Sequence, residues 1–196
     1  MRSIILLSLM ISAFFSEAQV LKLTGSIGYS TIETPQYKKI VLYTERVVNY
    51  EFTSHRKLYL LAGIGTGNLQ FNAINSQGDE SFIKMQLLSF PVTVRKYEYL
   101  KNESFFFFDI GMMGNYFFKQ KEETKVTGEN IKQENLGLTM GISGGAGYKR
   151  MMTGKIGIEI AFNVQIDCFS SFSNKKNEIS NNKKMISLGI SKKFGK

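Results

Sequence analysis

Acidic, amide and hydroxyl side chains recur at alternate positions within apolar segments of the chain. Two carboxylates, Glu159 and Asp167, would suit general acid and base chemistry if both faced one bond. Eight residues of one extended strand separate them, however, which places them ~26 Å apart. Polar groups on a buried face must be paired, so a structural role is favoured over catalysis. This inward set comprises Asp109, Asn115, Thr139, Ser143, Glu159, Asn163, Gln165 and Asp167, with Arg95 and Lys149 toward one end.

Other chemistry-bearing residues give little support for an active site, and we expect no enzyme. The single histidine, His55, lies in a predicted short turn without an acidic partner at a useful spacing. A Ser-His-Asp arrangement acting on lipids would need its groups at the opposite end of the strands. The single cysteine, Cys168, shares the apolar parity of its strand and is read as a small apolar residue. No cofactor or metal site is indicated, because glycine-rich segments 63–67 and 141–147 lie within strands and no helix follows.

The glycines have a distinctive placement in residues 136–149, LGLTMGISGGAGYK. Alternate side chains of a strand lie on opposite faces, so one face here is apolar and the other is nearly bare. Glycine is a poor strand former, and a bare face in water would gain nothing from it. The bare face is therefore expected to look into a narrow interior, where larger side chains such as Phe107, Met113 and Gln165 lean over the glycines.

Alternation recurs along the chain, and no helix is predicted. The predicted strands cover about 21–30, 39–52, 58–71, 82–97, 105–118, 136–149, 155–169 and 185–194. In the seventh, Ile160 and Phe162 face outward and Asn163 faces inward. Connections after odd-numbered strands are long and polar, and those after even-numbered strands are short; the long ones are 31–38, 72–81, 119–135 and 170–184. This pattern predicts an all-β, eight-stranded antiparallel up-and-down barrel.

A soluble lipocalin-like barrel would show the same alternation, so other features must decide. Strands of ~10–15 residues are long enough to cross a bilayer at a tilt. Tyrosines near the strand ends fit two interfacial girdles, with Tyr50, Tyr97 and Tyr148 at the short-turn end and Tyr29, Tyr43 and Tyr116 at the other. These features favour a transmembrane barrel. Its interior is expected to be filled by side chains, and a narrow channel for water or small solutes is the alternative.

The chain begins with features typical of a secretory signal. Residues 1–18 combine a basic start, an apolar run and small residues before Ala18, so we predict cleavage there. A retained anchor is the alternative, although the run is short for a bilayer. Residues 19–196 are then a single domain, and one cysteine provides no disulfide. The net charge of +9 is explained by lipid headgroups or a solvated surface, and no nucleic acid partner is expected.

Two residues fit this scheme poorly. Pro91 lies in the middle of a strand, where it has no amide to donate, so a bulge or twist is expected. Arg46 falls on the apolar parity of its strand, where an arginine facing mid-bilayer would be costly. Either that strand is bulged, or Arg46 lies above the membrane.

The segments LLSFPVTVRKYEYL and FFFFDIGMMGNYFF (87–100 and 105–118) resemble the small outer-membrane β-barrel proteins of the Bacteroidota, loosely called the porin family, with the architecture of OmpX- and OmpA-type barrels. The resemblance covers essentially the whole chain. It implies the outer membrane of a Gram-negative bacterium, with outer-membrane lipid and the barrel-assembly machinery as partners. The assembly signal would comprise Ser187, Gly189 and Phe194, although Lys192 departs from the pattern. We expect a structural or surface-interaction role for the outer loops, whose ligand or partner is not identified by the sequence.

Overall fold

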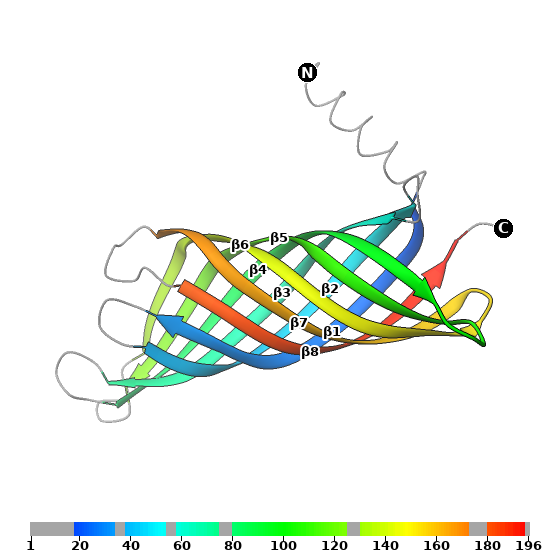
Figure 1. Ribbon diagram of the computed structural model, residues 1–196. Coiled ribbons are helices and arrows are strands. Elements are labelled where there is room, and N and C mark those ends of the chain that lie inside the picture. Colours follow the sequence, from blue (N-terminus) through cyan, green and yellow to red (C-terminus); the bar gives the residue numbers. More distant parts are fainter. Residues whose placement is uncertain are drawn as a thin grey trace, which may run out of the picture.

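A computed structural model describes residues 18–33, 38–53, 58–74, 80–124, 130–172 and 180–194, which form a closed antiparallel barrel (Figure 1). Each strand pairs with the next, and β8 pairs with β1. This confirms the predicted all-β, eight-stranded fold. Within the described ranges, no helix is long and apolar enough to cross a membrane. The strands are β1 (Ala18–Glu33), β2 (Lys38–Thr53), β3 (Leu58–Ile74), β4 (Glu80–Tyr99), β5 (Ser104–Thr124), β6 (Asn130–Thr153), β7 (Ile156–Phe172) and β8 (Ser180–Lys193).

The two ends of the barrel carry different connections. The turn end, at the right of Figure 1, holds residues 100–103 between β4 and β5 and residues 154–155 between β6 and β7. The opposite end, which we call the loop end, joins β1 to β2, β3 to β4, β5 to β6 and β7 to β8. Residues 1–17, with most of the predicted signal peptide, lie outside the described residues, as does the predicted turn that contains His55.

The predicted long connections are wrong in extent, because the strands continue into them. β5 reaches Thr124 and β6 begins at Asn130, so most of the expected loop 119–135 is paired strand. The pairing continues there through partners such as Glu122 and Ile131. Polar residues dominate both faces of these extensions. They therefore lack the alternation of apolar and polar residues from which the strands were predicted. The barrel thus rises beyond the apolar band, most of all at β5 and β6.

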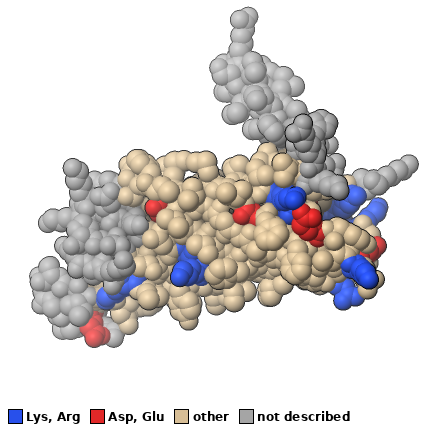
Figure 2. Space-filling model, in the orientation of Figure 1, with Lys and Arg blue, Asp and Glu red and all other residues tan. Residues whose placement is uncertain are grey.

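The outer face of the barrel carries exposed apolar side chains. On β7 they alternate with inward polar residues and are 42–53% exposed; they are Ile156, Ile158, Ile160, Phe162 and Ile166. A soluble protein rarely exposes so large a contiguous apolar surface, whereas a lipid-facing band requires it. Figure 2 agrees for one face, where uncharged atoms cover most of the barrel and charged atoms gather toward the turn end.

The inner face pairs large side chains with glycines, as the parity predicts. A Cβ built at Gly147 would collide with the Phe107 ring. One built at Gly67 would lie 2.7 Å from the Tyr43 hydroxyl. Phe107 and Tyr43 are fully buried. These glycines are needed because an eight-stranded barrel has no room for two large side chains at one level.

The parity prediction is wrong for Leu136, which was expected on the outer face and is 4% exposed inside the barrel. The β5–β6 register shifts between Phe117 and Lys119, so that Asn135 and Leu136 together oppose Phe118. Asn135 has φ of 54°, a left-handed conformation that asparagine tolerates well. This β-bulge reverses the parity of β6 on its loop side.

The tyrosine girdles are also only partly correct. Tyr43 is fully buried in the interior, where its hydroxyl accepts a hydrogen bond from Lys183. The Tyr97 hydroxyl donates to the interior carboxylate of Glu51. Tyr29, in contrast, is 65% exposed on the outer face. Position near a strand end was used for the assignment, but parity decides which face a tyrosine occupies.

Neither poorly fitting residue lies at a bulge. The β3–β4 ladder is interrupted opposite Pro91, between the pairs Ala62–Val92 and Gly65–Ser89, but its register is unchanged and no bulge forms. The loss of a single donor is absorbed by skipping ladder bonds. Arg46 lies on the outer face in an unshifted part of β2, so of the two alternatives for this residue the bulge is wrong.

The two faces of β7 provide a test of this orientation. Ile160→Arg should lower the free energy of unfolding by ~2–4 kcal/mol, because an arginine would replace a lipid-facing side chain in the apolar band. Asn163→Ala, on the inner face, should cost less. Urea titration of protein refolded into lipid vesicles would measure both changes, with Ile160→Leu as the control. The opposite ranking would mean that the inner and outer faces have been exchanged.

Candidate functional site

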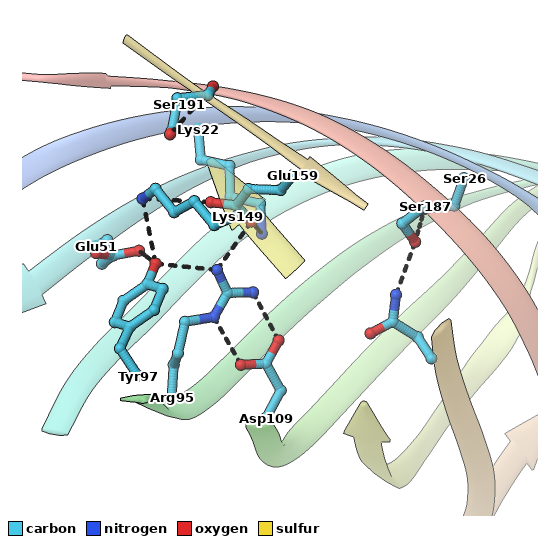
Figure 3. A network of polar contacts seen from close by, with 12 residues as sticks. Lys22, Ser26, Glu51, Arg95, Tyr97, Asp109, Lys149, Glu159, Ser187 and Ser191 are labelled. Atoms are coloured by element: carbon cyan, nitrogen blue, oxygen red, sulfur yellow. Dashed lines mark hydrogen bonds and ion pairs between the residues drawn. The ribbon is translucent and has the colours of Figure 1, made fainter. Parts of the chain in front are cut away.

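The main polar feature of the interior is an ion cluster centred on Arg95 of β4, which is 1% exposed (Figure 3). Its Nε and Nη2 atoms each donate to a different oxygen of Asp109, at 2.7 Å. Its Nη1 atom donates to Glu159 Oε2 at 2.9 Å. Arg95 and Asp109 are direct cross-strand partners of β4 and β5. The antiparallel register therefore sets up the bidentate pair, the strongest arrangement for a guanidinium and a carboxylate.

Glu159 of β7 joins this pair to two further strands. Lys22 of β1 lies 2.6 Å from Glu159 Oε2, and Lys149 of β6 lies 3.4 Å from Oε1. Lys149 and Glu159 are again direct cross-strand partners. The carboxylate is 2% exposed. A buried charge of this kind is tolerable only when opposite charges and donors surround it, and here three cations do so.

Aromatic groups complete the cluster. The Tyr97 hydroxyl donates to Glu51 Oε2 at 2.8 Å and accepts from both Arg95 Nη1 and Lys149 Nζ at 3.2 Å. The Arg95 guanidinium lies 3.7 Å from the centroid of the Phe107 ring, a cation–π contact. Figure 3 shows Tyr97 and Asp109 on either side of Arg95. With Lys22, Lys149 and Arg95 against Glu51, Asp109 and Glu159, the formal charges of the cluster balance.

A second network lies nearer the loop end. Lys183 of β8, which is fully buried, donates to Tyr43 Oη and to Asn115 Oδ1, both at 3.0 Å. The Asn115 amide nitrogen donates to Thr139 Oγ1 at 3.2 Å. Asp167 accepts from Gln165 Nε2 at 2.7 Å and from the backbone amide of residue 181 at 3.1 Å. These contacts tie β2, β5, β6, β7 and β8 together through their inner faces.

A cavity, a hollow and a packed apolar cluster adjoin the networks. Between them lies a cavity of about 90 Å³, lined by residues of both, including Arg95, Asp109 and Gln165. At the turn end, a hollow of about 300 Å³ is lined by Tyr59, Tyr97 and other aromatic residues. Toward the loop end the interior holds, beside the Lys183 network, a buried apolar cluster that comprises Ile32, Val41, Tyr43, Leu69, Phe71, Ala73, Ile83, Met85, Leu87, Phe117, Leu136 and Met185.

The structure distributes the sequence-selected residues over these networks. Asp109 and Glu159 lie in the Arg95 cluster, whereas Asn115 and Asp167 lie in the Lys183 network. Glu159 and Asp167 are therefore not brought together. Asn163 lies between the networks and donates to Ser187 Oγ at 2.7 Å.

The three residues of the proposed assembly signal occupy different surroundings. Ser187 is buried in the interior and hydrogen-bonds to Ser26 of β1 at 2.8 Å. Gly189 also faces inward, with the Lys22 side chain nearby. Phe194 follows the last residue of β8 and is 49% exposed. Recognition by an assembly machinery remains a prediction.

Several members of the networks were missed by the sequence reasoning. Lys22 and Glu51 share the inward parity of their strands and could have been found from that signal. Lys183 fell in the predicted connection 170–184, because β8 was expected to begin at Met185. Cys168 is exposed with a free thiol, on the outward parity expected for it.

The comparisons with known proteins give a fold. No family model matches the chain, and no curated protein matches it. Neisserial surface protein A, NspA, aligns with a TM-score of 0.56 at 8% identity, covering 89% of this chain and 97% of that one. OprG, an outer membrane protein of Pseudomonas aeruginosa, aligns with a TM-score of 0.58 at 12% identity, covering 92% and 98%. The fold is that of an outer-membrane β-barrel. Together with the apolar outer face, it places the chain in the outer membrane.

Removal of the central cation tests the role of the ion cluster. Arg95→Leu should destabilise the barrel by ~3–5 kcal/mol, because Asp109 would lose its bidentate partner and Glu159 one of its cations in a buried site. The double variant Arg95→Leu/Asp109→Leu should lose less, since no lone carboxylate remains at that position. Urea unfolding in vesicles measures both changes, and Arg150→Leu on the exposed outer surface is the control. An Arg95→Leu loss no larger than the control would show that the cluster is not structural.

Proposed function

We propose that this chain is a non-enzymatic barrel of the outer membrane of a Gram-negative bacterium, with an interior closed by its own side chains and a surface-interaction role at the loop end. The observation that carries the proposal is the filled interior. The Arg95 cluster occupies the half toward the turn end, and the Lys183 network with the apolar cluster around Leu69 and Phe117 occupies the other. Neither leaves a site in which an acid, a base and a nucleophile converge on open space.

The finer identity rests on the sequence. The two segments that resemble the small barrel or porin family of the Bacteroidota support membership of that family. Residues 1–18 are proposed to be a removed signal peptide, and residues 19–196 the barrel domain. Proposed partners are the outer-membrane lipid and the barrel-assembly machinery, which would read Ser187, Gly189 and Phe194 of the last strand.

The proposed interaction surface is the β5–β6 extension. β5 has 21 residues and β6 has 24, more than any other strand. The exposed side chains of the β5–β6 extension carry both signs of charge and include Lys121, Lys132 and Glu134. Paired strands hold such side chains in fixed positions. Binding a ligand there costs less conformational entropy than binding it to a flexible loop, which would have to become ordered.

A narrow channel for water or small solutes is the second candidate. The cavity of about 90 Å³ and the hollow of about 300 Å³ at the turn end are the features that favour it. Conduction would require a water path through the apolar cluster at the loop end, which includes Ile32, Leu69 and Phe117.

Single-channel recording distinguishes the two functions. Purified protein in planar bilayers should show no steady conductance, because two layers of packed side chains block the interior. Arg95→Ala/Asp109→Ala should remain silent as well, since the apolar cluster is untouched. A porin of known conductance, added last, provides the positive control. A steady ohmic current that changes in Asp109→Asn would establish the channel instead.

Labelling of single cysteines tests the orientation. In a Cys168→Ser background, Lys121→Cys on β5 should react with a membrane-impermeant maleimide on intact cells. Lys155→Cys, in the turn between β6 and β7, should react only after the outer membrane is opened. Both parent residues are exposed, so accessibility to the reagent is matched. Labelling of position 155 alone on intact cells would place the loop end in the periplasm and remove the proposed interaction surface from the outside.

A further inference from the structure

A gap interrupts the apolar outer face where β1 meets β2. A Cβ built at Gly25 would meet no atom within 4 Å. The cross-strand partners of Gly25 are Arg46 on β2 and Leu188 on β8. Leu188 is 61% exposed and belongs to the apolar band. Gly25 itself is central among the outward residues of its strand, which are Leu21, Leu23, Gly25, Ile27 and Tyr29. Arg46 therefore faces outward within the band, beside an empty position.

Two hollows meet at this position, and together we call them the Gly25–Arg46 groove. One, of about 870 Å³, is lined mainly by apolar residues, among them Leu23, Val48, Ile64, Leu188 and Ile190. The other, of about 380 Å³, is more polar and is lined by residues that include Thr44, Arg46, Thr66 and Asn68. Gly25, Arg46 and Thr66 line both. The groove is thus amphipathic along its length.

The polar part lies toward the loop end. On β2, Thr44 is nearer that end than Val48, and on β3, Asn68 is nearer than Ile64. This is the polarity of a lipid in the leaflet that faces the loop end, with its headgroup toward that end and its acyl chains toward mid-bilayer. No side chain of the barrel fills the gap at Gly25, so an acyl chain has room there.

Arg46 has no partner of its own within the described part of the chain: no hydrogen bond, ion pair or ring contact engages its guanidinium. Glu45, the acidic residue beside it, is buried inside the barrel. An uncompensated arginine is costly in hydrocarbon. A phosphate group would compensate it, since a guanidinium binds phosphate bidentately and the hydroxyl groups of Thr44 and Thr66 can donate as well.

We propose that the Gly25–Arg46 groove binds an outer-leaflet lipid through its phosphate headgroup, with an acyl chain in the gap at Gly25. Charge complementarity selects this occupant. A second copy of the chain docked about a two-fold axis would bring the same positive surface against itself. The assignment to the outer leaflet rests on the proposed orientation of the loop end, whereas the phosphate site itself depends only on the outer wall of a membrane-spanning barrel.

Native mass spectrometry of the delipidated protein in detergent tests the proposal. The probes are dioleoyl phosphatidic acid and dioleoylglycerol, which share acyl chains and differ in the phosphate. Wild-type protein should retain the phosphatidic acid about tenfold better, the effect of one charge-assisted contact. Arg46→Gln should abolish the difference, and Gly25→Leu, which fills the gap without a clash, should reduce retention of both lipids. Arg150→Gln, on the outer face near the turn end, should behave as wild type.

Several outcomes would overturn the proposal. Equal retention of the two lipids by the wild type, or unchanged retention by Arg46→Gln, removes the phosphate site. Arg46→Lys keeps the charge but loses the planar fork of the guanidinium, so it should retain less phosphatidic acid than the wild type and more than Arg46→Gln; a loss as complete as in Arg46→Gln would count against the proposal. A wild-type dimer peak that Gly25→Leu abolishes would assign the groove to a second copy. Gel mobility of unheated samples establishes that each variant forms the barrel.

Discussion

Hydrocarbon offers no hydrogen-bond partner to backbone amides and carbonyls, so a sheet that crosses it must close. The pairing of β8 with β1 meets this demand. Closure with eight strands leaves a narrow interior, and every inward position must then fit its neighbours. Gly147 yields its space to the Phe107 ring, and that ring lies against the Arg95 guanidinium. The ion cluster therefore follows from the closed backbone as much as from its own charges.

Much of the fold could be predicted because the bilayer imposes a strict period of two on each strand. β7 is the clearest case, with isoleucines and phenylalanine outward and Glu159, Asn163 and Gln165 inward. The prediction lost accuracy where the bilayer no longer acts on the chain. Beyond the apolar band, β5 and β6 continue with polar residues on both faces, so their ends were placed too early. The bulge at Asn135 then shifted Leu136 to the other face, and alternation by itself cannot detect a single inserted residue.

The interior polar residues could be selected by parity, but not their partners. Direct cross-strand pairs such as Arg95–Asp109 and Lys149–Glu159 depend on register, which a single sequence does not specify. Lys22 lies on β1 and Glu159 on β7, so their contact reaches across β8, the strand that closes the barrel. Tyr43 and Tyr97 were assigned from their positions along the strands. Their hydroxyl groups instead serve Lys183 and Glu51, as donors and acceptors that buried charges need.

The span of the ion cluster has a consequence for assembly. Lys22 and Glu159 belong to β1 and β7, which are brought close only when β8 closes the seam. Before that step an open sheet holds Glu159 without Lys22, and it also lacks the Ser26–Ser187 hydrogen bond. Contacts so distant in sequence form late, and the closing transition is expected to be slow and cooperative. Neutralising the interior and sealing the seam are thus one event, which disfavours a partly closed barrel as a stable intermediate.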